Sequence, residues 1–238
     1  MPRRLIHLWM VLPPSVPLDD LLAELPTVEL PPSNLSRHQA REWHYVWTRV
    51  ALRRILSFHT GLASRAISIQ RLCKYCGDPV HGKPVIYDPN PERSTLGFSM
   101  SHVSDLAVVA VTHDGEVGVD VEGLAADSQA ICRIAITKEE ADATAQLSQS
   151  QRHHTLMQFW VRKEAILKAI GVGLAVSPRF LQVAGGRPQP SHAWLPVRGG
   201  GYGTWYVRDI PIGPGHVTSV AARHPARIRV TSLDWAKN

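Results

Sequence analysis

Two acidic residues, Asp120 and Glu122, stand two positions apart in the segment GVDVE. Side chains two positions apart on an extended strand project from the same face, so both carboxylates would share one surface while Val119 and Val121 face the core. A solvent-facing alternation of acidic and apolar residues has the same pattern. The pair alone therefore does not define a site.

A third acidic residue, Glu164, lies in the segment FWVRKEAILKAIGVGL together with Trp160 and Lys168. Positions four apart on a helix are neighbours, so these three side chains share one stripe. Glu164 and Lys168 alone could be an ordinary exposed ion pair. That interpretation leaves unexplained why a third carboxylate, a tryptophan and two lysines follow a strand with paired carboxylates. If the helix packs on that strand, the three carboxylates converge.

Converging carboxylates indicate a metal ion. Three carboxylates close together raise one another's pKa unless a cation lies between them, and oxygen ligands favour a hard ion, Mg²⁺ first. Mg²⁺ commonly completes its coordination with phosphate oxygens and water. We therefore predict Asp120, Glu122 and Glu164 as metal ligands and a di- or polyphosphate as the substrate.

A segment that nearly matches the phosphate-loop pattern ends at Gly82-Lys83-Pro84. Pro84 stands where a metal-binding hydroxyl is required, and the residues that follow indicate a strand and a turn, so we reject a phosphate loop. Lys83 remains a candidate for phosphate contact as a point charge. Arg49 and Arg53 share a helix face and suit bidentate phosphate contact, although they could equally solvate the helix.

Two further groups suit ligand binding. Ser101-His102 precedes a predicted strand, where side chains can reach a ligand at the end of a sheet, although a lone histidine is more often structural. Cys73, Cys76 and His81 match the first three ligands of a zinc knuckle, but the fourth ligand is missing. A zinc-knuckle-like nucleic-acid-binding protein is therefore an alternative. A nucleotide hydrolase that uses the same carboxylates is another.

The elements that must position these residues follow from the apolar pattern. Strands are predicted at residues 6–12, 66–70, 106–112 and 116–121, the last two as a hairpin that turns at Asp114-Gly115. Helices are predicted at residues 18–25, 36–59, 126–134 and 155–170, and after the capping box at Thr137. Gly171 ends the strongest helix, a turn is predicted at residues 88–91, and the remainder reads as strands and turns. The late segment VTSVAA faintly repeats LAVVAV, which hints at two related halves joined near residue 113.

Composition restricts the setting. The chain has 238 residues, 44% of them hydrophobic, enough for one sizeable core or two small cores packed together. Three cysteines and no apolar signal segment after Met1 indicate a reducing, cytoplasmic setting, and no apolar run reaches the length of a bilayer span. The formal charge of +6 and the isoelectric point near 9.5 favour polyanionic partners: nucleic acid, a phosphorylated cofactor or an acidic protein surface.

Taken together and in this order, GKP, FSMSH, GVDVE and FWVRKEAILKAIGVGL resemble the Sfp-type 4'-phosphopantetheinyl transferases. The similarity extends to Leu8-Trp9, to residues 49–56 and to VTSVAA, so it spans most of the chain. The resemblance implies an α+β, pseudo-twofold monomer of two similar halves. Residues 1–112 would contact the 3'-phosphate and adenine of coenzyme A, residues 113–238 would carry the metal-binding carboxylates, and the active site would lie between the halves.

The resemblance also implies roles for individual residues. Asp120, Glu122 and Glu164 would hold Mg²⁺ against the diphosphate of coenzyme A, and Lys168 would contact phosphate. The coenzyme A contacts would fall on Arg53, Lys83, Pro84, Ser101, His102, Asp120, Lys163 and Lys168, with a further basic residue at Arg37 or Arg41. Asp105 departs from the family pattern, because it places an acid near the expected phosphate site.

The implied activity is that of a holo-[acyl-carrier-protein] synthase. A serine of an apo acyl- or peptidyl-carrier protein would attack the β-phosphorus of coenzyme A and release 3',5'-ADP. The catalytic candidates are Asp120, Glu164 as the base, and Lys168, which with Lys163 would offset charge on the leaving group. The expected partners are coenzyme A and the acidic surface of a carrier protein of fatty-acid, polyketide or nonribosomal-peptide assembly, with no nucleic acid and no membrane.

Overall fold

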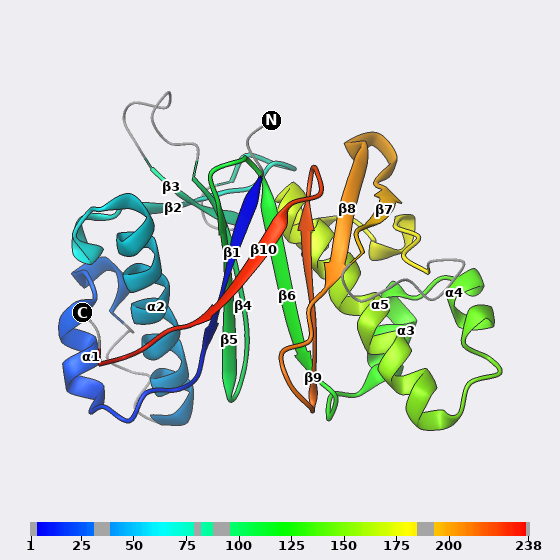
Figure 1. Cartoon of the computed structure of the whole chain (residues 1–238), viewed down its shortest axis with the longest axis horizontal. Coiled ribbons are helices and arrows are strands. Elements are labelled where there is room, and N and C mark those ends of the chain that lie inside the picture. Colours follow the sequence, from blue (N-terminus) through cyan, green and yellow to red (C-terminus); the bar gives the residue numbers. More distant parts are fainter. Residues whose placement is uncertain (1–3, 31–38, 79–81, 88–95, 185–192, 237–238) are drawn as a thin grey trace.

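The computed structural model describes residues 4–30, 39–78, 82–87, 96–184 and 193–236, with the side chains of residues 39–42 excepted. The fold is mixed α+β (Figure 1). Its described strands form two four-stranded sheets and one two-stranded ribbon. In Figure 1 the first sheet and its helices lie on the left, and the second sheet and its helices lie on the right.

The first sheet has the strand order β10 (Arg227–Ser232), β1 (Leu5–Val11), β5 (Leu106–Thr112) and β4 (Gly97–Val103). β1 runs parallel to β10 and antiparallel to β5. Every residue of β5 is buried, as its continuous apolar run predicts. The helices of this unit are α1 (Leu18–Glu24) and α2 (Gln39–Thr60), and the ribbon pairs β2 (Ile69–Leu72) with β3 (Lys83–Ile86).

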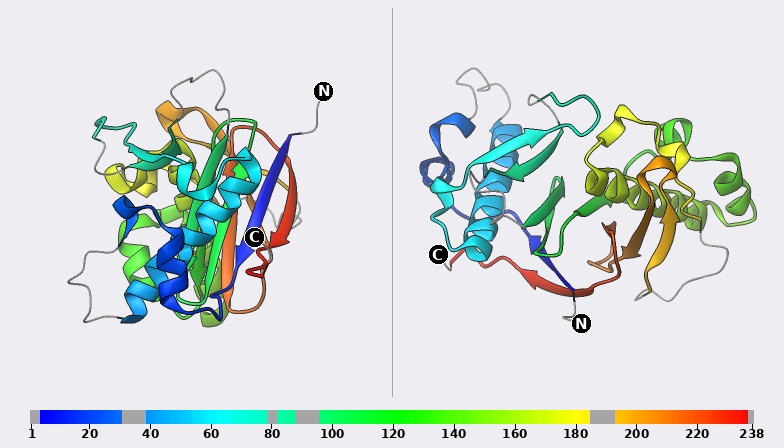
Figure 2. Two further views of the ribbon diagram at one scale, coloured as in Figure 1. Left: turned by 90° about the vertical axis from the view of Figure 1, so that its left-hand side faces the viewer. Right: turned by 90° about the horizontal axis from the view of Figure 1, so that it is seen from above.

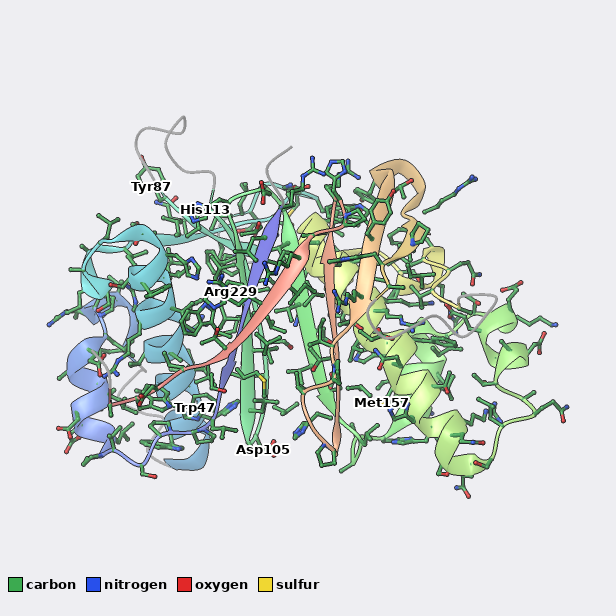
Figure 3. The ribbon with its side chains drawn as sticks, in the orientation of Figure 1. Trp47, Tyr87, Asp105, His113, Met157 and Arg229 are labelled. Atoms are coloured by element: carbon green, nitrogen blue, oxygen red, sulfur yellow. The ribbon has the colours of Figure 1, made fainter. Side chains whose placement is uncertain are left out.

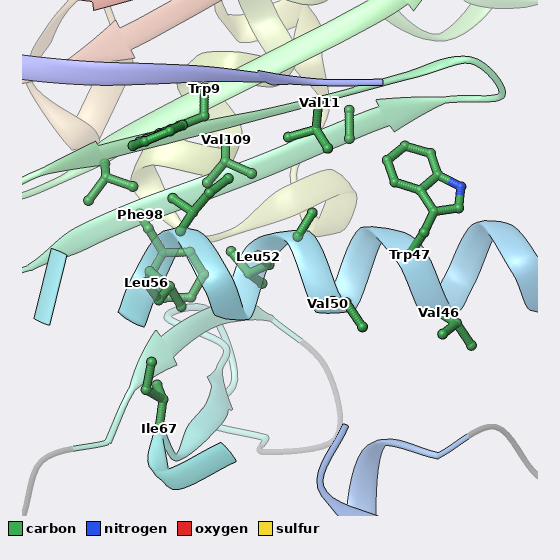
Figure 4. Packing of buried hydrophobic residues seen from close by; sticks show 14 of the residues in the cluster. Trp9, Val11, Val46, Trp47, Val50, Leu52, Leu56, Ile67, Phe98 and Val109 are labelled. Atoms are coloured by element: carbon green, nitrogen blue, oxygen red, sulfur yellow. The ribbon is translucent and has the colours of Figure 1, made fainter. Parts of the chain in front are cut away.

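The core of this first unit forms where α2 meets the sheet (Figure 4). Trp47 extends from α2 toward the strands, whereas Val50, three positions later, points away from them on the other side of the helix (Figure 4). They belong to one buried cluster with Trp9, Phe98 and Val109, which come from β1, β4 and β5. The first sheet is thereby fixed as a platform for the residues at its edge strand, β4.

The second sheet has the strand order β6 (Val117–Gly123), β9 (His216–Ala222), β8 (Thr204–Asp209) and β7 (Leu195–Arg198). Its long helix α5 (Gln149–Ile170) packs on β6 and β9 and is preceded by α3 (Ser128–Ala135) and α4 (Lys138–Ala143). Gly171 ends α5 in the left-handed conformation (φ 89°), which a residue without a Cβ adopts at little cost.

The two sheets meet along β4 and β6 and share an apolar core. Ile6 and Val108 from the first sheet and Val119 and Val220 from the second belong to the same buried cluster. The view from above in Figure 2 shows both units with their helices. The GVDVE segment lies in β6, so its acidic residues are located at the junction of the two units.

Most of the predicted elements are confirmed, with shifted ends. α5 begins at Gln149 instead of residue 155, because Ser148 and Gln151 form a capping box there. The capping box at Thr137 is present and begins α4. β2 begins at Ile69 instead of residue 66, because residues 64–66 form a 3₁₀ turn. The segment before His102, predicted only as a short segment, is the strand β4, and the predicted turn at 88–91 lies outside the described residues.

The predicted hairpin at Asp114-Gly115 is wrong. β5 pairs with β1 and β4, whereas β6 pairs with β9. The turn carries the chain from the first sheet to the second, and Gly115 adopts a positive φ of 102° within it. The boundary expected between residues 112 and 113 falls at this crossing, but β10 returns from the C-terminal end to the first sheet.

Candidate active site

The acidic strand β6 lies directly under α5, and Gly118 permits this close approach. A Cβ at Gly118 would overlap the carbonyl oxygen of Ala165 and the backbone nitrogen of Ala169. Glycine inside a strand marks such an approach of another backbone. Gly118 therefore brings the helix that carries Glu164 close to the strand that carries Asp120.

Asp120 is the centre of a polar network between three elements. Its Oδ1 lies 2.6 Å from the ammonium nitrogen of Lys168 on α5 and accepts a 2.7 Å hydrogen bond from the hydroxyl of Ser101 on β4. Lys168 also donates to the Ser101 hydroxyl at 2.9 Å. The Asp120 side chain is only 5% exposed, so its charge depends on Lys168 for compensation. The network joins both units at one carboxylate.

Glu122 is held by Trp160, which lies on the same stripe of α5 as Glu164 and Lys168. The indole nitrogen of Trp160 donates a 3.1 Å hydrogen bond to Oε1 of Glu122. Burial raises the pKa of Glu122, and the Trp160 hydrogen bond opposes this effect. Trp160 therefore orients Glu122 and favours its charged form.

Glu164 lies on the stripe between Trp160 and Lys168, near enough to both acids of β6 for their charges to act on its pKa. Burial, followed by the negative charge of Asp120, raises the pKa of Glu164 to about 7, although Lys168 acts in the opposite direction. A carboxyl group with such a pKa exchanges its proton near neutral pH. The charges of Asp120 and Glu122 both act on Glu164, so the stripe brings the three carboxylates into mutual influence.

Two buried oxygen atoms of this cluster have no hydrogen-bond partner: Oδ2 of Asp120 and Oε1 of Glu164. A buried acceptor without a partner is costly, and a hard cation with oxygen ligands would satisfy both atoms. Within the described residues, no three acidic, cysteine or histidine side chains form a ready-made metal cage. The ammonium of Lys168 instead compensates Asp120. The two unpartnered carboxylate oxygens are of the donor type that Mg²⁺ prefers.

A cavity of about 340 Å³ opens beside the carboxylates. Lys83, Pro84 and Lys168 line it, which brings together three of the predicted coenzyme A contacts. Its remaining wall is formed by Gly82, Ser99, Met100 and residues 171–175. Lys83 also donates to the backbone oxygens of Val117 and Ala169 at 2.8 and 3.1 Å, and burial lowers its pKa to about 8. The cavity suits a ligand with an apolar body and an anionic end.

His102 lies next to this cluster and near other basic groups. Its ring is 4.5 Å from that of His44 in an edge-on arrangement. Desolvation, then the positive charges around it, including those of Lys168 and Arg49, lower the pKa of His102. Asp105 points elsewhere: it is exposed and contacts His216 at 3.2 Å, at the lower end of the sheets in Figure 3. The unexpected acid is therefore engaged away from Lys168.

The structure does not bring Arg53 to the site, which corrects its assignment to coenzyme A binding. The guanidinium of Arg53 is buried and forms paired hydrogen bonds with Glu29 at 2.7 and 2.9 Å. It also donates to the backbone oxygens of Ser64 and Ile67. All of these partners lie within the first unit, so Arg53 ties loops to α2.

Lys163 is a second correction. Its ammonium is completely buried and forms an ion pair with Glu140 at 2.7 Å, away from Asp120. Lys163 is thus not available to contact coenzyme A or to offset charge on a leaving group. Arg37 and His81 lie outside the described residues, as does the side chain of Arg41.

Residues that sequence reasoning missed hold the two units in register. Ser99 on β4 accepts a 3.1 Å hydrogen bond from the backbone nitrogen of Val119 on β6. Gly118, the glycine of the GVDVE segment, allows α5 to approach β6. The one local signal was a glycine between two buried valines in a strand, which indicates a close contact but not its partner.

The segment that carries the carboxylates is similar in sequence to known proteins. Residues 116–203, which contain all three carboxylates and Lys168, match the family model described as 4'-phosphopantetheinyl transferase superfamily. The chain is 28% identical to the 4'-phosphopantetheinyl transferase HetI of Nostoc sp. over 71% of its own length and 70% of the relative. It is 27% identical to the L-aminoadipate-semialdehyde dehydrogenase-phosphopantetheinyl transferase of Mus musculus over 79% of its own length and 63% of that protein.

A third relative is a putative 4'-phosphopantetheinyl transferase of Synechocystis sp., which is 27% identical over 40% of this chain and 38% of its own length. The comparisons give no support to the nucleic-acid-binding alternative. Among the described helices, none has the length and apolar character needed to cross a membrane.

Proposed function

Because the chain belongs to the 4'-phosphopantetheinyl transferase superfamily, we propose that it transfers the 4'-phosphopantetheine arm of coenzyme A to a serine of an apo carrier protein. The observation that carries the proposal is the ion pair of Asp120 and Lys168, with Glu164 near enough for both charges to act on its pKa. These residues come from a strand and a helix within the segment that matches the family. They lie beside a cavity with basic residues in its wall.

The proposed metal is Mg²⁺, held by Asp120, Glu122 and Glu164. The two buried oxygens without partners, on Asp120 and Glu164, support this choice. Bound there, Mg²⁺ would polarise phosphate and neutralise its charge. Trp160 would keep Glu122 oriented toward the site, since its indole already holds that carboxylate.

In the proposed reaction the serine oxygen of the carrier protein bonds to the β-phosphorus of coenzyme A. The bond from that phosphorus to the bridging oxygen breaks, and 3',5'-ADP leaves with the electron pair. Glu164 accepts the serine proton as the general base. Lys168 donates to phosphate oxygens and offsets the charge that develops on the leaving group.

Substrate placement follows from the cavity. Lys83 and Pro84 contact coenzyme A along its wall, while Ser101 keeps Lys168 and Asp120 aligned. His102 lies at the same edge and is proposed to contact the adenosine phosphate end. The net charge of +6 favours both an anionic cofactor and an acidic carrier surface, so association should weaken as salt rises.

We also propose that residues 1–112 and 113–238 form two related halves. Each sheet has four strands, although β10 of the first sheet comes from the second half, and each half has a helix of 22 residues, α2 or α5. The repeated segments LAVVAV and VTSVAA lie in β5 and β9, which are inner strands of their sheets. We further propose that the protein is a monomer with its site between the halves.

The deciding experiment is the intact mass of an apo carrier protein after incubation with this protein, coenzyme A and Mg²⁺. We expect a gain of roughly a third of a kilodalton, the mass of one phosphopantetheine. Omission of Mg²⁺ should prevent the gain. Release of phosphate from ATP without any carrier protein would instead indicate a nucleotide hydrolase.

A further inference from the structure

A fully buried ion pair lies on another side of α5 from the carboxylate cluster. The ammonium of Lys163 and the carboxylate of Glu140 are 2.7 Å apart, and both side chains are 0% exposed. Lys163 directly precedes Glu164. Each residue advances a helix by roughly 100°, so the lysine side chain leaves α5 about a quarter of a turn away from Glu164.

The pair gathers several segments at one point. Lys163 also donates to the backbone oxygen of Ala135, at the end of α3, at 2.7 Å. Glu140 accepts hydrogen bonds from the backbone nitrogens of Thr137 and Val183, each at 3.1 Å. The end of α3, the start of α4 and the segment after Leu181 are therefore all bonded to α5 through one lysine.

A buried ion pair contributes little net stability compared with apolar residues of the same size, because both charges lose water. The pair instead fixes the orientation of α5, because each hydrogen bond requires its donor and acceptor in particular positions. An apolar contact would tolerate rotation of α5 about its axis, whereas Lys163 has its partners in one orientation only. In that orientation Trp160 and Lys168, on either side of Glu164 along the stripe, donate hydrogen bonds to the acids of β6.

We propose that the Lys163–Glu140 pair is a positioning device that fixes the rotation of α5, so that Glu164 and Lys168 point at Asp120. Lys163 touches no reacting atom in this role. The inference rests on the proposed function, because it concerns the metal and phosphate groups of that site. Lys163 thus has a task different from that of Lys168, which is partly exposed and lines the cavity.

The test compares Lys163→Met with the control Lys138→Met. Lys138 also pairs with a carboxylate, that of Asp142, but both side chains are largely exposed (84% and 64%). We expect Lys163→Met to weaken Mg²⁺ binding and to lower kcat, each by about 10- to 100-fold, as loss of residues that orient metal ligands does. The KM for the carrier protein should stay unchanged, and the control should match the wild type throughout.

Calorimetric Mg²⁺ affinity in the presence of coenzyme A requires no carrier protein, so it judges the pair separately from the proposed transfer reaction. If Lys163→Met does not fold, Glu140→Gln decides, because it keeps the side-chain shape and removes the charge. A purely structural pair would lower the melting temperature alone. The inference would be overturned by variants that are folded at the assay temperature and keep wild-type Mg²⁺ affinity and kcat. A failure of the wild-type protein to modify any carrier protein would count only against the proposed function.

Discussion

Lys168 Nζ lies 2.6 Å from Oδ1 of Asp120, and this contact joins the last turns of α5 to the centre of β6. The lysine is 29% exposed and the aspartate only 5%, so the pair has a buried acid and a cation that reaches solvent. Lys168 also lines the neighbouring cavity. A single ammonium group is therefore placed to compensate the acid and to meet an anionic ligand.

Replacement of either central carboxylate tests the metal site. Asp120→Ala and Glu164→Ala should each reduce transfer of phosphopantetheine by at least about a hundredfold, because each removes charge that the reaction requires. Circular dichroism should show an unchanged fold, since neither residue belongs to the apolar core. Glu139→Ala, an exposed acid on α4, is the control and should leave activity unchanged. Full activity in either site variant would refute the assignment.

The pKa of Glu164, raised to about 7, predicts a pH-dependent response to Mg²⁺. Without metal, the folded protein favours the protonated carboxyl, so this group's contribution to stability is present at low pH and declines as pH rises from about 4.5 to 7. Mg²⁺ binds the deprotonated form. It should raise the melting temperature more at about pH 8 than at about pH 5.5.

Glu164→Gln, which does not titrate, should flatten that difference in thermal melts recorded with and without Mg²⁺. His154→Gln, an exposed substitution on the same helix, should keep it. An equal Mg²⁺ shift at both pH values in the wild type would show that the carboxyl with the raised pKa does not bind the metal.

The stripe of Trp160, Glu164 and Lys168 could be predicted from the sequence because i, i+4 spacing is a local property of a helix. The role of Lys163 could not be predicted from the sequence. It has the same charge as Lys168 and stands next to Glu164, so only its burial against Glu140 separates the two lysines. Arg53 was misassigned for the same reason, because Glu29, its partner, is distant in sequence.

Strand pairing also lies beyond local signals. Asp114-Gly115 has the chemistry of a hairpin turn, yet β6 pairs with β9, nearly a hundred residues later in the chain. The turn residues determine that the chain bends, whereas the apolar faces of distant strands determine which sheet each strand joins. The local prediction therefore found both strands and the shared face of Asp120 and Glu122, and assigned them the wrong neighbour.

The contacts of Arg53 predict a structural effect without an effect on coenzyme A. Arg53→Met should lower the free energy of unfolding by about 3 kcal/mol, because it leaves Glu29 and two backbone oxygens without their donor. The KM for coenzyme A should remain within about twofold of the wild type, a change too small to reflect a lost phosphate contact.

Urea unfolding measures the change in stability, and steady-state kinetics measures the KM for coenzyme A. Arg65→Met, an exposed substitution, is the control for stability; a tenfold rise in KM in folded Arg53→Met would restore Arg53 as a phosphate ligand.

The lowered pKa of His59, a histidine remote from the carboxylates, predicts how the stability of the fold depends on acid pH. His59 accepts a 3.1 Å hydrogen bond from the indole nitrogen of Trp9, and its pKa is lowered to about 4 by burial and then by the nearby His7 and His113. The folded state therefore favours neutral His59, whereas an unfolded histidine takes up a proton near pH 6.5. The stabilisation is complete above about pH 6.5 and is lost as the pH falls toward 4.

His59→Gln keeps an acceptor for Trp9 and cannot titrate, so its urea midpoint should fall less steeply between about pH 6.5 and 4 than that of the wild type. The same slope in both proteins would mean that His59 is protonated without cost in the folded state.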